Sequence, residues 1–124
     1  MSAVTVNFDA SDLAAQIEKL KPEQIDRLPF GVVQLDREGV VVFYNATEAR
    51  LSGYGMSPLG QKFFEVSRCS GKADFEARIA KAQEEGAVDL EFAFPGDPAN
   101  SVREMRIRVQ SCSQGGVWLL VERD

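Results

Sequence analysis

Three polar side chains in the first half of the sequence are spaced so that they could meet at one cavity. Tyr44 ends a strand-like segment, and Glu48 and Ser52 follow it four residues apart in a helix-like segment. Side chains four residues apart share one face of a helix. A phenol, a carboxyl group and a hydroxyl group could together bind the polar end of a small ligand. The alternative is that Glu48 only completes a capping box begun by Asn45 and lies exposed.

Cys69 is the second candidate for chemistry. It follows an aromatic-rich stretch, and Arg68 beside it would favour the reactive thiolate form. Because the chain contains no histidine, this thiol has no evident general base, and enzymatic turnover is not expected. A cysteine that is acylated once to hold a prosthetic group needs no such base. The alternative is an inert, small core residue.

Other chemistry is poorly supported by the sequence. The absence of histidine removes the commonest ligand for zinc, copper and haem iron, and no metal site is predicted. Cys112 falls in an expected hairpin loop over residues 111–115, and we assign it no role. Arg106 and Arg108, with Arg103, are expected on the solvated face of a strand.

The overall composition is that of one globular domain. The 124 residues include 14 basic and 19 acidic side chains, a formal net charge of −5, with 44% hydrophobic residues. This acidic balance argues against binding to nucleic acid. No apolar run approaches the roughly 20 residues of a membrane span, and the N-terminus lacks a signal-peptide pattern. We therefore expect a cytoplasmic protein that binds neither nucleic acid nor membranes.

Periodicity and turn residues predict the order of the elements. A helix over residues 11–20, capped by Ser11, precedes a helical turn that starts at Pro22. A β-hairpin over residues 30–44, a helix that begins after Asn45 and a helix over residues 72–85 come next. Three strands follow, over residues 88–94, 105–110 and 117–121. This order predicts an α+β domain with an antiparallel sheet and helices segregated on one side.

The chain resembles the photoactive yellow protein family, a branch of the PAS domain superfamily. The resemblance extends over nearly the whole chain, and its matching segments are residues 28–36, 44–48, 52–53, 60–64, 66–69 and 118–123. It implies the PAS fold, in which an antiparallel five-stranded sheet carries helices on one side and an N-terminal helical cap. Residues 1–28 would form the cap and residues 29–124 the PAS core, within a single domain.

The resemblance also implies a cofactor and its site. In that family a cysteine carries p-coumaric acid as a thioester, and the phenolate end of this chromophore is buried. Cys69 would be the attachment site, Tyr44 and Glu48 would donate hydrogen bonds to the phenolate, and Ser52 stands where a threonine supports the tyrosine. The rest of the pocket is expected to be apolar, formed by Val32, Val33, Phe63, Val66 and Phe94.

The implied function is blue-light sensing rather than enzymatic turnover. Light would isomerise the chromophore, and Glu48 would then protonate the phenolate and remain as a buried carboxylate. Partial unfolding, beginning in a lightly packed cap, would signal to an unknown downstream protein. We expect a monomer or weak dimer. The alternative is a PAS sensor or interaction module that binds another small ligand or a partner without a covalent chromophore.

Three features depart from the family pattern. Tyr54 stands where an arginine usually shields the chromophore, and Arg68 stands where a proline usually precedes the cysteine. The segment over residues 94–101 differs from the loop that gates the chromophore. We expect these differences to affect the absorption maximum and the recovery rate more than chromophore attachment.

Overall fold

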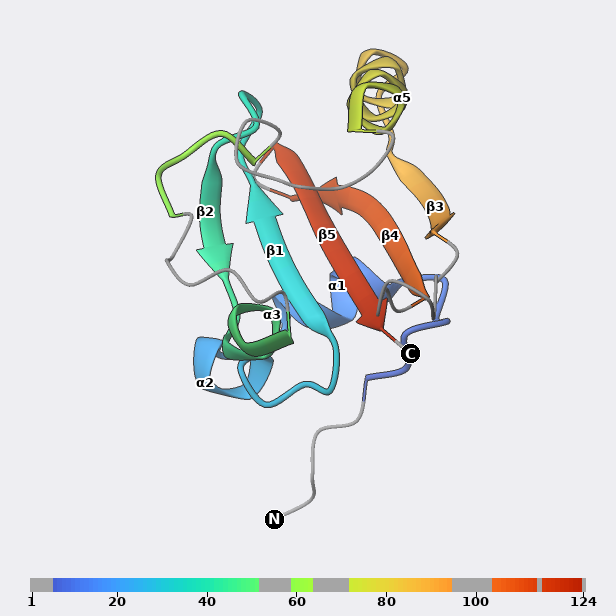
Figure 1. Ribbon diagram of the computed structural model, residues 1–124. Helices are drawn as coiled ribbons and strands as arrows, with labels where there is room; N and C mark the ends of the chain where they lie inside the picture. The colour runs from blue at the N-terminus through green and yellow to red at the C-terminus, as the bar shows by residue number, and fades with distance from the viewer. Residues whose placement is uncertain (1–5, 52–58, 64–71, 95–103, 114, 124) are drawn as a thin grey trace.

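The computed structural model describes residues 6–51, 59–63, 72–94, 104–113 and 115–123 (Figure 1). Its central feature is a five-stranded antiparallel sheet in the order β2-β1-β5-β4-β3. The strands are β1 (Gly31–Leu35), β2 (Val41–Tyr44), β3 (Asp89–Phe94), β4 (Met105–Cys112) and β5 (Gly116–Arg123). This sheet confirms the predicted α+β class and PAS fold.

The β1–β2 hairpin forms where the turn residues predict it. One carboxylate oxygen of Asp36 accepts hydrogen bonds from the amides of Glu38 (2.8 Å) and Val40 (3.0 Å). Gly39 adopts a φ of +83°, a conformation that a residue with a Cβ rarely takes. The turn therefore returns the chain as β2, and Tyr44 comes to lie opposite Val33.

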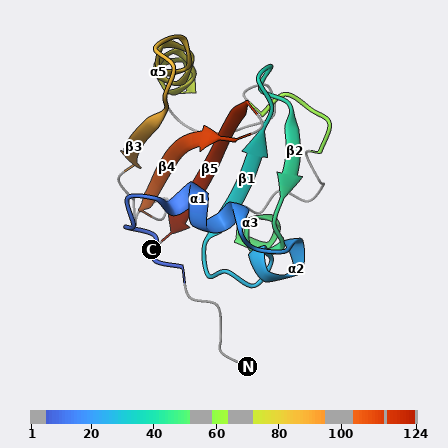
Figure 2. The same ribbon diagram turned by 180° about the vertical axis from the view of Figure 1, so that it is seen from behind.

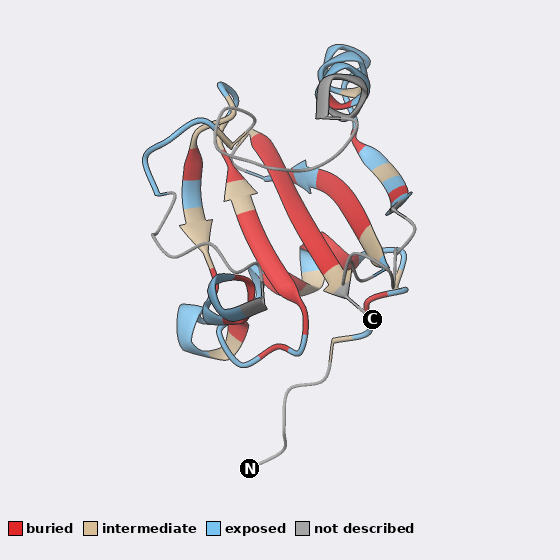
Figure 3. Cartoon of the chain, viewed as in Figure 1, coloured by how far each residue is buried: buried red, intermediate tan, exposed pale blue. Residues whose placement is uncertain are grey.

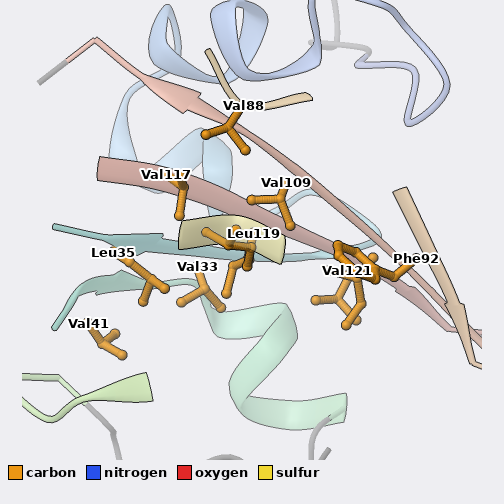
Figure 4. Packing of buried hydrophobic residues seen from close by; sticks show 11 residues of the cluster. Val33, Leu35, Val41, Val88, Phe92, Val109, Val117, Leu119 and Val121 are labelled. Atoms are coloured by element: carbon orange, nitrogen blue, oxygen red, sulfur yellow. The ribbon is translucent and has the colours of Figure 1, made fainter. Parts of the chain in front are cut away.

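Both faces of the sheet are covered, and the central strand β5 is buried over its apolar residues 117–121 (Figure 3). One cluster contains Val33, Leu119 and Val121, whose side chains gather on one face (Figure 4). The other cluster contains Val32, Trp118 and Leu120. The residues alternate between the clusters because successive side chains of a strand point to opposite faces.

Helices cover the two faces differently. α1 (Leu13–Glu18) crosses the face seen in Figure 2, and α2 (Pro22–Ile25) follows it in the chain. α3 (Ala46–Leu51) packs against β1, and α5 (Lys72–Glu84) precedes β3. The helix predicted over residues 72–85 and the turn beginning at Pro22 are confirmed. Among the described residues, no helix is long and apolar enough to cross a membrane.

The N-terminal segment, by which we mean residues 6–28, is packed more firmly than expected. Its side chains Phe8, Leu13, Ile17, Ile25 and Leu28 are all buried in the second cluster. The expectation of a lightly packed cap is therefore wrong. The reason is that the apolar stripe of α1 has an apolar sheet face directly beneath it.

Three local expectations are also corrected. Asp12 rather than Ser11 is the N-cap of α1. Arg108 is not solvated, because the N-terminal segment covers its face of the sheet and leaves it 7% exposed. Arg106 on the same face is only partly exposed, since it bonds to Asp9 of that segment. Cys112 is not in a loop but is the buried last residue of β4, paired with Gly116.

Candidate functional site

Asn45 connects the strand hairpin to α3 and fixes the first turn of that helix. It is fully buried, and its side-chain oxygen accepts hydrogen bonds from the amides of Glu48 and Val32, both at 2.9 Å. Its side-chain nitrogen donates to the carbonyls of Ile25 (2.9 Å) and Phe30 (3.2 Å). Asn45 therefore acts as the N-cap of α3 and also ties that helix to β1.

Two further bonds join α3 to the residues that follow α2. The hydroxyl of Thr47 donates to the Leu28 carbonyl at 2.6 Å, and Thr47 is itself buried. The Asp26 carboxylate accepts a hydrogen bond from the Ala46 amide at 2.8 Å. The helix that carries Glu48 is thus anchored to the end of the N-terminal segment as well as to the sheet.

The Glu48 side chain turns inward, over β1. It is only 6% exposed, which contradicts the alternative of an exposed capping glutamate. A Cβ atom built on Gly31 would lie 2.0 Å from Glu48 Oε1, so the carboxyl group occupies the space above that glycine. The amide of Asn45 donates to the Val32 carbonyl at 3.0 Å, so β1 continues the support beneath the helix.

Tyr44 lies on the same face of the sheet as this carboxyl group. Tyr44 pairs with Val33 across the antiparallel strands, and directly opposed residues share a face. Gly31 precedes Val33 by two residues and therefore presents the same face. Tyr44 and Phe63, both partly buried, pack against the cluster that contains Val33. The structure thus gathers Tyr44, Glu48, Val33 and Phe63 on one side of the sheet.

Val32 lies on the other face. It is fully buried in the cluster formed with the N-terminal segment and Trp118, away from Tyr44 and Phe63. The sequence grouped Val32 with Val33 because both are apolar, but neighbours in a strand cannot line the same side of a sheet. We therefore remove Val32 from the candidate pocket.

The remaining predicted site residues lie wholly or partly outside the described part of the chain. Ser52, Val66 and Cys69 lie outside the described residues. Phe94 ends β3, where its backbone pairs with Met105, but its side chain is also outside the described part. Among the described residues, no group of three or more histidine, cysteine, aspartate or glutamate side chains could hold a metal ion.

The prediction from sequence missed the role of Gly31. Its signal was a glycine inside a β-rich segment, a position where another group often approaches the backbone closely. Asn45 was recognised as a helix cap, but its bonds to β1 and to the end of the N-terminal segment were not foreseen. Both residues bear on how the Glu48 carboxyl group is held.

Comparison with known proteins identifies the family. The family model described as the PAS fold matches residues 19–123. The chain is 26% identical to the photoactive yellow protein of Rhodothalassium salexigens over 121 residues, covering 95% of this chain and 97% of the relative. It is 29% identical over 124 residues to the protein of the same name from Cereibacter sphaeroides, covering 95% and 97% of the two chains.

A solved structure agrees with these relatives. The photoactive yellow protein domain of the sensor histidine kinase Ppr from Rhodospirillum centenum is similar with a TM-score of 0.70 and 32% sequence identity. The match covers 86% of this chain and 95% of that domain. The chain therefore belongs to the PAS domain superfamily and, within it, to the photoactive yellow protein family. A PAS sensory domain is the class of protein that the fold and the relatives define.

Proposed function

We propose that this protein is a blue-light photoreceptor that carries p-coumaric acid as a thioester on Cys69. The observation that carries the proposal is the placement of the Glu48 carboxyl group, buried above Gly31 on the sheet face that Tyr44 shares. Burying a phenolate costs free energy unless it receives hydrogen bonds. The phenol of Tyr44 and a protonated carboxyl group of Glu48 are suitable donors. The described part of the site therefore fits the phenolate end of the chromophore.

Each residue of the proposed site has its own role toward the chromophore. When bound, the p-coumaroyl group supplies the absorption of blue light, a double bond that isomerises and a phenolate oxygen. Glu48 would donate one hydrogen bond to that oxygen, and the Tyr44 hydroxyl would donate a second. Val33 and Phe63, with Val66 and Phe94, exclude water, and Ser52 supports Tyr44.

With the chromophore bound, Glu48 would give up its proton after light absorption, and its carboxyl group would become a carboxylate. The carboxylate then remains in a site that is 6% exposed, and an uncompensated buried charge costs several kcal/mol. Asn45 and Thr47 link the first turn of α3 to the carbonyls of Ile25 and Leu28. We therefore expect strain at Glu48 to reach the end of the N-terminal segment and to loosen it from the core.

The wider parts of the proposal concern signalling. The cap of residues 1–28 acts as the element that responds, and residues 29–124 act as the sensing core. The protein works in the cytoplasm as a monomer or weak dimer and passes its signal to a downstream protein. The net charge of −5 supports the view that it binds neither nucleic acid nor membranes.

The test is to load the full chain with an activated p-coumaroyl ester. The Cys69 thiolate displaces the activating group, and intact mass then rises by one coumaroyl group. We expect a visible absorption band that bleaches in blue light and recovers in darkness. Cys69→Ala should abolish both the mass increase and the band, and Cys112→Ala should retain them.

Three outcomes would contradict the photoreceptor proposal or its attachment site. An adduct that absorbs only in the near ultraviolet would mean that the pocket does not hold a phenolate. Absence of any adduct on the folded chain would favour a PAS module that binds another small ligand or a partner. Loss of the adduct in Cys112→Ala alone would show that Cys112, and not Cys69, is the attachment site.

A further inference from the structure

The N-terminal segment is fastened to the sheet at two separate places. At its beginning, Arg108 Nη1 donates hydrogen bonds to the carbonyls of Phe8 (2.7 Å) and Ala10 (2.6 Å). Gln110 on the same strand donates to the Ser11 carbonyl at 3.0 Å and accepts from the Ala14 amide at 2.7 Å. These bonds use neutral backbone groups of the segment, so their strength does not depend on a carboxylate.

The second fastening is made by Glu18, the last residue of α1. One carboxylate oxygen, Oε2, accepts a hydrogen bond from the Trp118 indole N–H at 2.8 Å and another from the Ser113 amide at 2.9 Å. Trp118 is buried on β5, and Ser113 directly follows β4. This contact therefore joins the end of α1 to the β4–β5 hairpin.

The Glu18 contact depends on the charge of the carboxylate. Partial burial raises the pKa of Glu18, but the hydrogen bonds from Ser113, Trp118 and Cys112 together outweigh it and leave the pKa below its ordinary value. Among the described residues, no lysine or arginine forms an ion pair with Glu18. An ionised acceptor forms stronger hydrogen bonds than a neutral one, so adding a proton weakens both contacts.

We propose that Glu18 is an acid-sensitive latch, whose ionised carboxylate fastens the end of α1 to the β4–β5 hairpin and whose protonation loosens that contact. Because the folded-state pKa is lowered, the latch contributes its full stabilisation above the unfolded-state pKa and loses it as the pH falls through the folded-state pKa. Arg108 and Gln110 keep their bonds to the segment when Glu18 is protonated. The end of α1 then loosens, while Ile17 still packs on the sheet and residues 8–11 stay docked.

The latch is distinct from the proposed photosite. Glu18 and Trp118 lie on the sheet face covered by the N-terminal segment, whereas Tyr44 and Val33 lie on the opposite face. Among the described residues, Asp9 is the one carboxylate of the segment that forms an ion pair with the sheet, and it bonds to Arg106 near the first fastening. The latch therefore acts whether or not a chromophore is attached.

Trp118 provides a direct readout, because it is the only tryptophan in the chain. We would follow its indole N–H resonance in ¹⁵N-labelled full-length protein as the pH is lowered. In the natural chain the resonance should titrate with a midpoint below the ordinary glutamate range, while the amides of Val33 and Leu119 report an intact sheet. In Glu18→Gln this transition should vanish. Glu23→Gln is the matched control, since Glu23 is exposed in α2 and has no hydrogen bond to the described residues.

Hydrogen exchange at neutral pH supplies a second measurement that does not require acid. Glu18→Ala removes the acceptor and keeps a strong helix former in α1. The amides of Lys19 and Leu20, which close the end of α1, should exchange about three- to tenfold faster in this variant. Glu23→Ala should leave them unchanged.

Either of two results would overturn the proposed role of Glu18. One is an indole resonance that titrates in Glu18→Gln as it does in the natural chain. Another is unchanged exchange of Lys19 and Leu20 in Glu18→Ala. If the sheet unfolds in acid before the indole resonance moves, the exchange rates alone decide.

Discussion

The carboxyl group of Glu48 occupies the space that a side chain at position 31 would need, since a Cβ on Gly31 would lie 2.0 Å from Glu48 Oε1. A strand residue thus determines whether a helix residue can turn inward. Glycine at this position gives up side-chain packing in β1. In return, the sheet accepts a polar group directly against its backbone.

The first prediction tests this pairing. Gly31→Ala should destabilise the fold by about 1–3 kcal/mol, because the methyl group and the carboxyl group cannot both fit. Combining it with Glu48→Ala removes the competing group, so the double variant should be less destabilised than the sum of the two single variants. Urea denaturation of the four proteins measures the coupling. Strictly additive free energies would contradict the close approach.

Asn45 is predicted to be a major source of stability. Asn45→Ala removes a helix cap and leaves the Val32 amide and the Ile25 carbonyl without their buried partner. We expect a loss of about 3 kcal/mol in the free energy of unfolding. Asn7→Ala is the control, because Asn7 is exposed and its side chain bonds only to the nearby Asp9 amide among the described residues. An equal effect of the two substitutions would refute the assigned role.

In chromophore-loaded protein, Glu48→Gln should shift the visible absorption band to longer wavelength. An amide is a weaker donor than a carboxylic acid, so it stabilises the ground-state phenolate less. The variant also cannot release a proton, so the light-driven change should lack the step that leaves a buried charge. Absorption spectra before and after illumination measure both effects. An unchanged spectrum would indicate that Glu48 does not contact the phenolate.

Arg106 and Arg108 should contribute differently to the free energy of unfolding, although they lie on one face of one strand. Arg108 is buried and bonds to two carbonyls of the N-terminal segment, so Arg108→Ala should cost about 2 kcal/mol. Arg106 is 30% exposed in ion pairs with Asp9, Glu91 and Glu122, so Arg106→Ala should cost about 1 kcal/mol or less.

Limited proteolysis near residues 6–12, at low and high salt, separates these two arginines. Salt should mimic the loss of Arg106, because it screens exposed ion pairs. It should leave the buried bonds of Arg108 largely intact. The reverse order of sensitivity would show that the ion pairs, and not the carbonyl bonds, hold the segment.

Much of the fold could be predicted because its signals are local. Asp36 and Gly39 make a tight turn between two β-rich runs, and the alternation in β3 and β4 follows the two-residue period of a strand. The spacing of Tyr44 and Glu48, from a strand end into a helix, also indicated a shared side. The resemblance then supplied a chemical reason for that pair of residues.

The sequence by itself thus determined the order of the elements, the family and the expectation that Tyr44 and Glu48 lie on one side of the sheet. Only the tertiary structure decided which face each residue presents. Val32 and Val33 point to opposite faces because β1 is a strand, but which of them shares a face with Tyr44 follows from the register of β1 with β2. The burial of Arg108 and the contact of Glu18 with Trp118 depend on a segment about 100 residues away in the chain. Such contacts leave no local pattern, because they exist only after the sheet has formed and the N-terminal segment has closed over it.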